Sequence, residues 1–377
     1  MYIRQKQLDN LRRLISPGKV VVLYGARRTG KTTLVQEFLK EVQEEHRLVV
    51  SGEDITVHDF LASRSIEKLR AFVGSSRLLV IDEAQRITDI GLNLKLIVDH
   101  IEGVRVIATG SSSFDLARNI GEPLTGRKYT LRLFPLAQLE IGVNENPAQT
   151  TANLESRLVY GSYPEIVLMT DNRRREQYLQ EIVASYLYKD VLELDGVRHS
   201  AKIGRLLQLI AFQIGREVSY AELAVNLGMS KNTAERYLDL LEKAFVVVRL
   251  QGFSRNLRKE ITKNCRYYFL DNGIRNALIN NFNPLLLRDD AGLLWENYLV
   301  MERLKKQEYL GIAANNYFWR TYTKQEIDFV EERGGRLYGF EMKWGKGRNR
   351  PPREWATAYP EAAWQVVNRE NYLEFIG

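Results

Sequence analysis

The chain has 377 residues and a formal net charge of +7 at pH 7, a length that exceeds what one hydrophobic core usually serves and therefore predicts two or three domains. Its single cysteine, Cys265, excludes an internal disulfide and a cysteine-based zinc site. The positive charge favours an anionic partner, with nucleic acid as a candidate, although excess charge also simply promotes solubility. The N-terminal stretch MYIRQKQLDNLRRL is too charged for a signal peptide, and no apolar run is long enough to span a bilayer. We therefore expect a cytoplasmic protein without a membrane partner.

Short apolar strands alternate with helical segments over the first 140 residues. An amphipathic helix is expected at residues 4–15, and a helix with an apolar face follows residue 30. This alternation predicts a parallel sheet covered by helices. The expected strands are Val20–Tyr24, Leu48–Ser51, Leu78–Asp82, Val104–Thr109 and Leu131–Leu136.

A phosphate-binding loop follows the first of these strands. Residues 25–33 read GARRTGKTT and match G-x-x-x-x-G-K-T between a predicted strand and a predicted helix, which is the context the motif requires. The glycines allow the backbone amides to approach phosphate, and the helix N-terminus adds partial positive charge. We expect Lys31 to reach the β and γ phosphates of ATP and Thr32 to ligate Mg²⁺. The predicted nucleotide-binding residues are Gly25, Ala26, Arg27, Arg28, Thr29, Gly30, Lys31, Thr32 and Thr33.

Two acids emerge at the end of the strand Leu78–Asp82, where α/β sheets bind ligands. This pattern resembles a Walker B motif. Asp82 is expected to hold Mg²⁺ and Glu83 to polarise the attacking water, because phosphoryl transfer needs a positioned nucleophile and charge neutralisation. A surface turn that begins with two acids is the alternative, which the phosphate-binding loop upstream makes the weaker one.

Two further catalytic candidates follow. The next strand ends in Thr109, Gly110 and three serines, so Ser111 is expected beside the γ-phosphate, with a helix-capping role as an equal alternative. Arg127, in LTGRKY, is a candidate arginine finger. If Arg127 acts in a neighbouring subunit, the protein is a homo-oligomer.

Residues 219–250 have the order of a helix–turn–helix followed by a strand, with the turn at residues 228–230. Ser230 is the expected N-cap of the second helix, and Leu238, Leu241 and Ala244 are expected to face the core. Basic residues crowd the second helix and the segment behind it, which suits phosphate contact. A packing module with a solvated basic face is the alternative. The predicted DNA-binding residues are Lys231, Asn232, Arg236, Arg255, Arg258 and Lys259.

Residues 326–344 predict a hairpin that turns at Gly334 and Gly335. A two-residue turn pairs Asp328 with Glu341 and Glu326 with Lys343, while Ile327, Phe329, Phe340 and Met342 lie on the opposite face. Opposed carboxylates favour a divalent metal, Mg²⁺ or Mn²⁺, between them. The spacing resembles the PD-(D/E)XK nuclease core, in which Glu296 would be the additional acid. An exposed Glu326–Lys343 ion pair, with Lys343 also offsetting Asp328 and Glu341, is the alternative.

The chain as a whole resembles the prokaryotic family of predicted AAA+ ATPases whose C-terminal half carries a winged helix and a restriction-endonuclease-like domain. The segments that carry the resemblance are, in order, RRTGKTTL, LLVIDEAQRI, ATGSSS, LTGRKYTLRLFPL, YGSYPEIV, YFLDNGI, EIDFV and FEMKWG. Ser162 stands where a glycine is expected before Tyr163. The resemblance implies hydrolysis of ATP with Mg²⁺ and adds weight to Arg127 as a γ-phosphate arginine. The implied fold class is α/β, with four segments: a P-loop ATPase domain of the AAA+ type at 1–140, a helical lid or linker at 141–200, a winged helix-turn-helix at 201–285 and a small α/β restriction-endonuclease-like domain at 286–377.

These features favour an ATP-dependent switch or motor that acts on DNA. Two alternatives stay open. The first is a metal-dependent DNA nuclease regulated by ATP, and the second is a nucleotide-gated module that binds a protein partner and has no nuclease activity.

Overall fold

The computed structural model describes residues 2–43, 46–110, 123–187, 200–255, 265–347 and 349–377. Its contacts divide the chain into two compact units. The first comprises Tyr2–Pro135 and Lys243–Phe245, and the second comprises Leu136–Glu242 and Val246–Gly377. Ser111, Arg258 and Lys259 lie outside the described residues.

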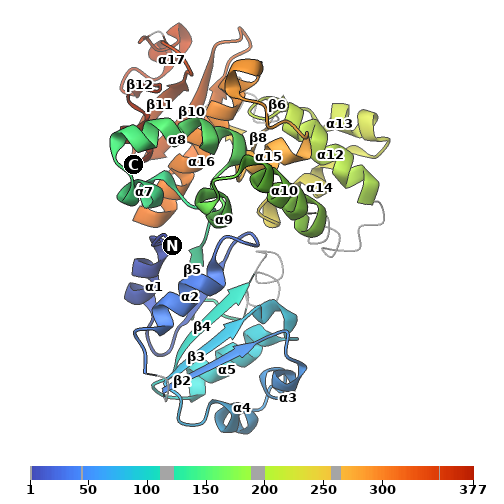
Figure 1. The fold of residues 1–377 in the computed structure, drawn as a ribbon, viewed down its shortest axis with the longest axis vertical. Helices are drawn as coiled ribbons and strands as arrows, with labels where there is room; N and C mark the ends of the chain where they lie inside the picture. The colour runs from blue at the N-terminus through green and yellow to red at the C-terminus, as the bar shows by residue number, and fades with distance from the viewer. Residues whose placement is uncertain (1, 44–45, 111–122, 188–199, 256–264, 348) are drawn as a thin grey trace. The chain divides into compact units, whose positions relative to one another are not determined.

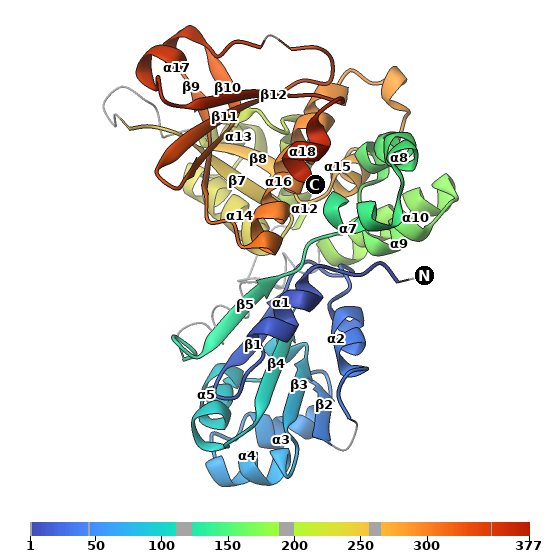
Figure 2. The same cartoon turned by 90° about the vertical axis from the view of Figure 1, so that its left-hand side faces the viewer.

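The first unit is built on a five-stranded sheet in the order β2-β3-β4-β1-β5 (Figures 1 and 2). All four pairings are parallel, which confirms the predicted parallel α/β sheet. The last strand ends at Arg132, four residues earlier than expected. This strand lies at the sheet edge and is mostly polar, whereas the residues that follow it are apolar. The sequence pattern therefore placed the strand too far toward the C-terminus. The strands are β1 (Val20–Tyr24), β2 (Arg47–Ser51), β3 (Leu78–Asp82), β4 (Arg105–Gly110) and β5 (Lys128–Arg132).

Helices cover both faces of this sheet because alternate strand residues point to opposite sides. Val21, Leu23 and Val80 pack with the apolar stripes of α1 and α2. Val22 and Ile81 pack with α3, α4 and α5 on the other face. Figure 2 shows these helices on the two sides of the sheet. Their bounds are α1 (Gln7–Leu14), α2 (Lys31–Leu39), α3 (His58–Leu61), α4 (Ile66–Val73) and α5 (Ile90–His100), with short 3₁₀ turns η2 (Ile55–Val57) and η3 (Ala84–Arg86).

The second unit contains a seven-stranded mixed sheet in the order β12-β11-β10-β9-β7-β8-β6. β7 pairs in parallel with β9 at Gln251 and Tyr317, so strands from the third and fourth predicted segments share one sheet. The division into four domains stays a prediction. The strands are β6 (Glu217–Val218), β7 (Val247–Gly252), β8 (Cys265–Phe269), β9 (Asn315–Arg320), β10 (Glu326–Arg333), β11 (Arg336–Met342) and β12 (Ala363–Val367).

The second unit opens with a series of helices, the first of which begins at Gln138, close to the start of the helical lid or linker predicted at 141–200. α16 is buried over much of its length and packs against β8, β11 and α18. Within the described residues, no helix is both long and apolar enough to cross a membrane. The helices are α7 (Gln138–Ile141), η5 (Gly142–Asn144), α8 (Pro147–Tyr160), α9 (Pro164–Leu168), α10 (Asn172–Ile182), η6 (Val183–Leu187), α12 (Ser200–Phe212), α13 (Tyr220–Leu227), α14 (Lys231–Lys243), α15 (Asn272–Leu278), η7 (Leu285–Leu287), α16 (Ala291–Leu310), α17 (Arg353–Ala358) and α18 (Tyr372–Ile376).

The expected helix–turn–helix elements are present as α13 and α14. Gly228 ends α13 in the left-handed conformation, at φ 55°, which favours glycine. The Ser230 hydroxyl accepts a hydrogen bond from the Thr233 amide at 3.1 Å, so Ser230 caps α14 as predicted. Leu238 and Leu241 are buried as expected, whereas Ala244 is half-buried.

The predicted hairpin is confirmed in its register. Phe329 pairs with Phe340, and Gly334 and Gly335 form the turn with φ values of 55° and 74°. The pairing of β10 with β9 shifts register between Ile327 and Val330. This bulge places Ile327 and Val330 in the same core cluster, so the faces do not alternate as strictly as expected.

Candidate nucleotide site

The predicted phosphate-binding loop joins β1 to α2. Gly30 precedes α2 with φ 96°, which a side chain rarely tolerates. A Cβ on Gly25 would lie 2.0 Å from the Leu133 carbonyl oxygen, so only glycine fits there. The two motif glycines are therefore required for different steric reasons. Gly30 is required by its positive φ, and Gly25 is required by the close approach of the Leu133 carbonyl.

Lys31 lies folded against this loop. Its ammonium Nζ donates to the carbonyl oxygens of Gly25 and Ala26, at 2.9 Å in both cases, and the side chain is buried. Thr29 closes the loop by donating its hydroxyl proton to the Ala26 carbonyl at 2.8 Å. The ammonium group of Lys31, the first residue of α2, is thus held against the loop at the N-terminus of the helix, which favours anions.

Thr32, Asp82 and Thr109 form a hydrogen-bonded chain beside the loop. The Thr32 hydroxyl donates to Asp82 Oδ2 at 3.1 Å, and the Thr109 hydroxyl donates to Asp82 Oδ1. The sheet order brings these residues together, because β4, which carries Thr109, lies between β1 and β3. Hydroxyl and carboxylate oxygens are the donors that Mg²⁺ prefers, so this set fits the expected ion.

Glu83 has a strained backbone at the same edge of the sheet. Its φ of 49° is unusual for a residue other than glycine, and its amide donates to the Thr109 hydroxyl at 3.3 Å. A Cβ on Gly52, the residue after β2, would lie 2.4 Å from the Glu83 carbonyl oxygen, so this position must also be a glycine. The Glu83 carboxylate accepts a hydrogen bond from the Gln85 side-chain amide. These contacts fix the direction of the acid next to the Thr32–Asp82 pair.

Gln5 belongs to this site although the sequence pattern did not indicate it. Its side-chain amide is buried and donates to the Thr29 carbonyl at 2.8 Å. Its Oε1 lies where a Cβ on Gly30 would approach within 3.1 Å. Gln5 precedes α1 and belongs to no nucleotide motif, so only the folded contact shows its role.

Arg127 lies at the other end of the sheet. Its carbonyl accepts from the amide of Val20, the first residue of β1, whereas the loop follows the last residue of that strand. Its guanidinium is bound to Asp99 at 2.6 Å. This placement does not support action on the loop of the same subunit. Action on a neighbouring subunit stays a prediction.

The C-terminal carboxylate cluster is organised around an arginine. Arg266 of β8 is buried, and its guanidinium lies 3.5 Å from Glu296 Oε1, 2.9 Å from Glu326 Oε2 and 3.8 Å from Asp328 Oδ1. Tyr268 donates to Glu296 at 2.7 Å. Lys343 pairs with Glu341, at 2.5 Å, rather than with Glu326.

These contacts set the electrostatics of the cluster. Burial first, and then the nearby Asp328 charge, raise the pKa of Glu296 to about 8. Burial also raises the pKa of Asp328 and that of Glu341. Burial alone would lower the pKa of Lys343, but Asp328 and Glu341 together raise it. The cluster is therefore a network of linked charges with a buried centre at Arg266, Glu296 and Asp328, and with Glu326 and Lys343 exposed at its edge.

The structure does not support the expected metal site. Among the residues that the structure describes, no group of three or more His, Cys, Asp or Glu side chains is arranged to hold a metal ion. The positive charge that opposed carboxylates require comes from Arg266 and Lys343 instead. The sequence did not indicate Arg266 because it reaches the cluster from β8, far from the hairpin in the chain.

The predicted DNA-binding residues divide into three groups. Lys231, Asn232 and Arg236 are exposed near the N-terminal end of α14. Arg255 lies 3.6 Å from Glu332 of the hairpin as an exposed ion pair. Arg258 and Lys259 lie outside the described part of the chain, so the structure places only the helix residues together.

Three family models match successive parts of the chain. Residues 17–142 match a family model described as an AAA domain, which indicates a nucleotide-binding ATPase domain. Residues 151–285 and 291–374 match two models described as domains of unknown function, DUF8612 and DUF4143. An uncharacterized protein of Mycobacterium tuberculosis is 31% identical over 347 residues, which cover 90% of this chain and 74% of that protein. Uncharacterized proteins of Methanocaldococcus jannaschii (23% identity; 83% of this chain and 72% of that protein) and Haemophilus influenzae (24%; 89% and 85%) are also similar.

Proposed function

The chain belongs to the family of AAA-domain proteins that includes this mycobacterial relative, and from that premise we propose that its first unit binds ATP with Mg²⁺ and hydrolyses it. The main support is the arrangement around the loop, in which Lys31 is held against the loop carbonyls and Thr32 is bonded to Asp82. A glycine-rich turn with a solvated lysine would not hold that lysine buried.

Each residue has a separate role in this proposal. The loop amides and the N-terminus of α2 bind the phosphates, and Lys31 turns from the loop carbonyls to the β and γ phosphates. Thr32 and Asp82 would hold Mg²⁺, which when bound neutralises charge on the phosphates. Glu83 orients the attacking water and accepts its proton, and the Thr109 hydroxyl fixes the Glu83 backbone.

Two substitutions test the site. Lys31→Ala should lower ATP turnover by about 100-fold or more, because it removes a charge that acts on the transferring phosphoryl group. Glu83→Gln should retain binding of ATP, measured by calorimetry, and lose turnover. Lys68→Ala, at an exposed position on α4, is the matched control. If wild type and Lys31→Ala hydrolyse ATP at the same rate, the proposal is wrong.

We also propose that the nucleotide acts on the second unit as a switch, and that this unit binds DNA through α14. The order α12, β6, α13, α14, β7, β8 supports a winged helix, and the exposure of Lys231, Asn232 and Arg236 near the N-terminal end of α14 supports contact with DNA there. A restriction-endonuclease-like fold for the last segment is part of the same proposal. Cleavage of DNA is the weaker alternative, because Arg266 binds the acids that would serve a metal.

Charge reversal tests the DNA proposal. Lys231→Glu should weaken binding to duplex DNA and reduce the slope of log affinity against log salt by about one or more, because a phosphate contact is lost. Lys68→Glu makes the same charge change on the first unit and should have a smaller effect. Fluorescence anisotropy at several salt concentrations measures both. Equal effects of the two variants would leave only non-specific attraction to a basic protein.

A further inference from the structure

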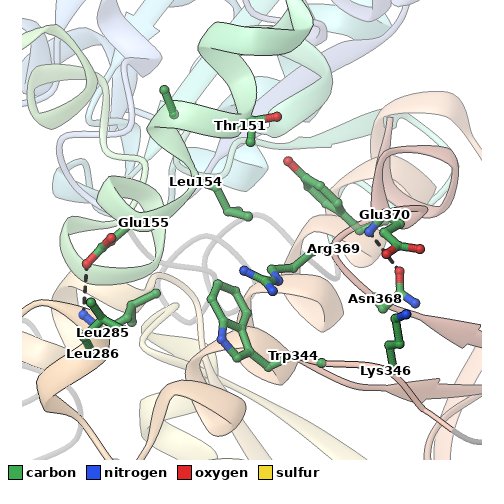
Figure 3. Close-up of a pocket in the computed structure, with 13 residues that line it drawn as sticks. Thr151, Leu154, Glu155, Leu285, Leu286, Trp344, Lys346, Asn368, Arg369 and Glu370 are labelled. Carbon is green, nitrogen blue, oxygen red and sulfur yellow. Dashed lines mark hydrogen bonds between the residues drawn. The ribbon is translucent and has the colours of Figure 1, made fainter.

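A pocket of about 600 Å³ lies in the second unit where two parallel strands end. Trp344 and Lys346 follow the C-terminal end of β11, and Arg369 follows that of β12. α8 and η7 form the other side, as Figure 3 shows through Leu154, Glu155 and Leu285. Crevices at the carboxyl ends of parallel strands are common ligand sites, and this volume is in the range of such sites.

The loops on both sides of the pocket are tied down. The Leu285 amide donates to Glu155 Oε1 at 2.9 Å, which holds η7 to α8. On the opposite side, Asn368 Oδ1 accepts from the Glu370 amide at 2.8 Å (Figure 3). The Asn368 amide itself donates to Asn371 at 2.8 Å. The walls are therefore ordered before any ligand arrives, which lowers the entropy cost of binding.

The cations of the pocket are available to a ligand. The Arg369 guanidinium lies 4.7 Å from the centroid of the Trp344 ring. In the described part of the chain, neither Arg369 nor Lys346 makes an ion pair, and both are exposed. A guanidinium stacked on an aromatic ring keeps its N–H edge, which binds a carboxylate through two parallel hydrogen bonds.

The apolar part of the lining is aliphatic. Leu154 and Leu285 are buried in the walls, whereas Leu286 is 97% exposed at the rim. An isolated exposed leucine needs no explanation, but one next to two buried leucines and an indole extends an apolar surface. The pocket thus offers an aliphatic surface beside two unpaired cations.

We propose that this pocket binds a peptide segment of a partner protein that presents a carboxylate, such as a free C-terminus, next to a large aliphatic side chain. Single-stranded nucleic acid fits less well. Arg369 already stacks on Trp344, the ring on which a base would lie, and Glu155 and Glu370 would repel a polyanion. A peptide brings a single carboxylate, whose charge Arg369 and Lys346 can offset, and its aliphatic side chain needs no stacking surface. Capture of a terminal carboxylate is a known mode of peptide recognition.

Short fluorescein-labelled peptides test the proposal on the full chain without nucleotide. Gly-Gly-Leu-Leu with a free C-terminal carboxylate should bind, and its C-terminal amide should bind about 10-fold more weakly because the charged hydrogen bonds to Arg369 are lost. Gly-Gly-Ser-Ser with a free carboxylate should also bind more weakly, and oligothymidylate should not compete. Fluorescence anisotropy measures all four.

Variants link the effect to this pocket. Arg369→Gln, at an exposed position, should fold normally by circular dichroism and bind the acid and the amide with equal affinity. Arg336→Gln, an exposed arginine on β11 outside the pocket, should behave as wild type. Equal affinity of wild type for the acid and the amide would overturn the proposal. No binding of the acid up to about 1 mM would also overturn it, and so would displacement of the peptide by oligothymidylate.

Discussion

Gln5 shows how a residue outside a motif can position it. Gln5→Ala removes the hydrogen bond to the Thr29 carbonyl and leaves space beside Gly30. We expect the KM for ATP to rise about fivefold, which corresponds to about 1 kcal/mol for one buried hydrogen bond, with a smaller change in kcat.

Gln7→Ala provides the matched control. Gln7 is also buried and also donates to a backbone carbonyl at 2.8 Å, but its acceptor is Arg132 on β5 rather than the phosphate-binding loop. Both variants should therefore lose a similar amount of stability, measured by thermal unfolding. If both also raise KM equally, Gln5 acts only through stability and not by positioning the loop.

The residues of the nucleotide site and of the C-terminal carboxylate cluster differ in how far the sequence could predict them. Gly25, Lys31 and Asp82 were predictable because a continuous stretch or a strand end carries each of them. Gln5 and Arg266 were not, because each reaches its site from a distant part of the chain through a contact that no local pattern encodes. The structure does not support the predicted metal site for the same reason, since Arg266 reaches the acids from a distant strand.

At the scale of elements, Asp271 ties a helix to a turn. It caps α15 by accepting from the Gly273 amide at 2.8 Å, and it accepts from the Ser162 amide at 2.7 Å. A Cβ on Gly161 would lie 1.9 Å from Asp271 Oδ1, so the turn at residues 161–164 is shaped around this carboxyl group. Burial raises the pKa of Asp271 to about 6 despite these hydrogen bonds.

This pKa predicts the pH dependence of Asp271→Asn. A carboxyl group whose pKa is higher in the folded than in the unfolded protein stabilises the fold below its unfolded pKa, and this contribution is lost as the pH rises through about 6. Asparagine does not ionise. The cost of the substitution in free energy of unfolding should therefore be about 2 kcal/mol smaller at about pH 7 than at about pH 4.

Urea unfolding followed by tryptophan fluorescence measures this difference. Asp171→Asn serves as the control for the loss of a carboxylate cap, because Asp171 caps α10 from an exposed position. A cost of Asp271→Asn that grows with pH would contradict the sign of the prediction.

The β10–β11 hairpin marks the limit of prediction for elements. Its register followed from the Gly334–Gly335 turn, because a two-residue turn determines which residues face each other. Its bulge did not, because the register shift arises in the pairing with β9. Local turn chemistry is encoded in a short segment, whereas the fit of a third strand depends on the whole sheet.

At the scale of the molecule, the distribution of tryptophans offers a direct test of the switch. All five lie in the second unit, at positions 295, 319, 344, 355 and 364. The candidate nucleotide site lies in the first unit. A change in tryptophan emission on binding of ATP would therefore report a signal that has passed between the units.

Hydrogen bonds tie the start of the second unit to a turn and to α16. The Leu136 amide donates to the Ser162 carbonyl at 2.9 Å, and the Leu136 carbonyl accepts from buried Lys305 at 3.1 Å. The Gln138 amide donates to Glu302 of the same helix, α16, at 2.5 Å. A displacement of the chain at Pro135 would thus be transmitted to α16, whose Trp295 lies against Trp344 and Tyr372.

We expect MgATP to change the tryptophan emission of wild type and of Glu83→Gln, because both bind ATP, and to leave Lys31→Ala unchanged. The change should reverse in wild type as ATP is consumed and persist in Glu83→Gln, since a switch follows the nucleotide that is bound. If wild type hydrolyses ATP with no change in emission, the two units work independently. The first unit would then be an ATPase whose nucleotide state does not change the conformation of the second unit around its tryptophans.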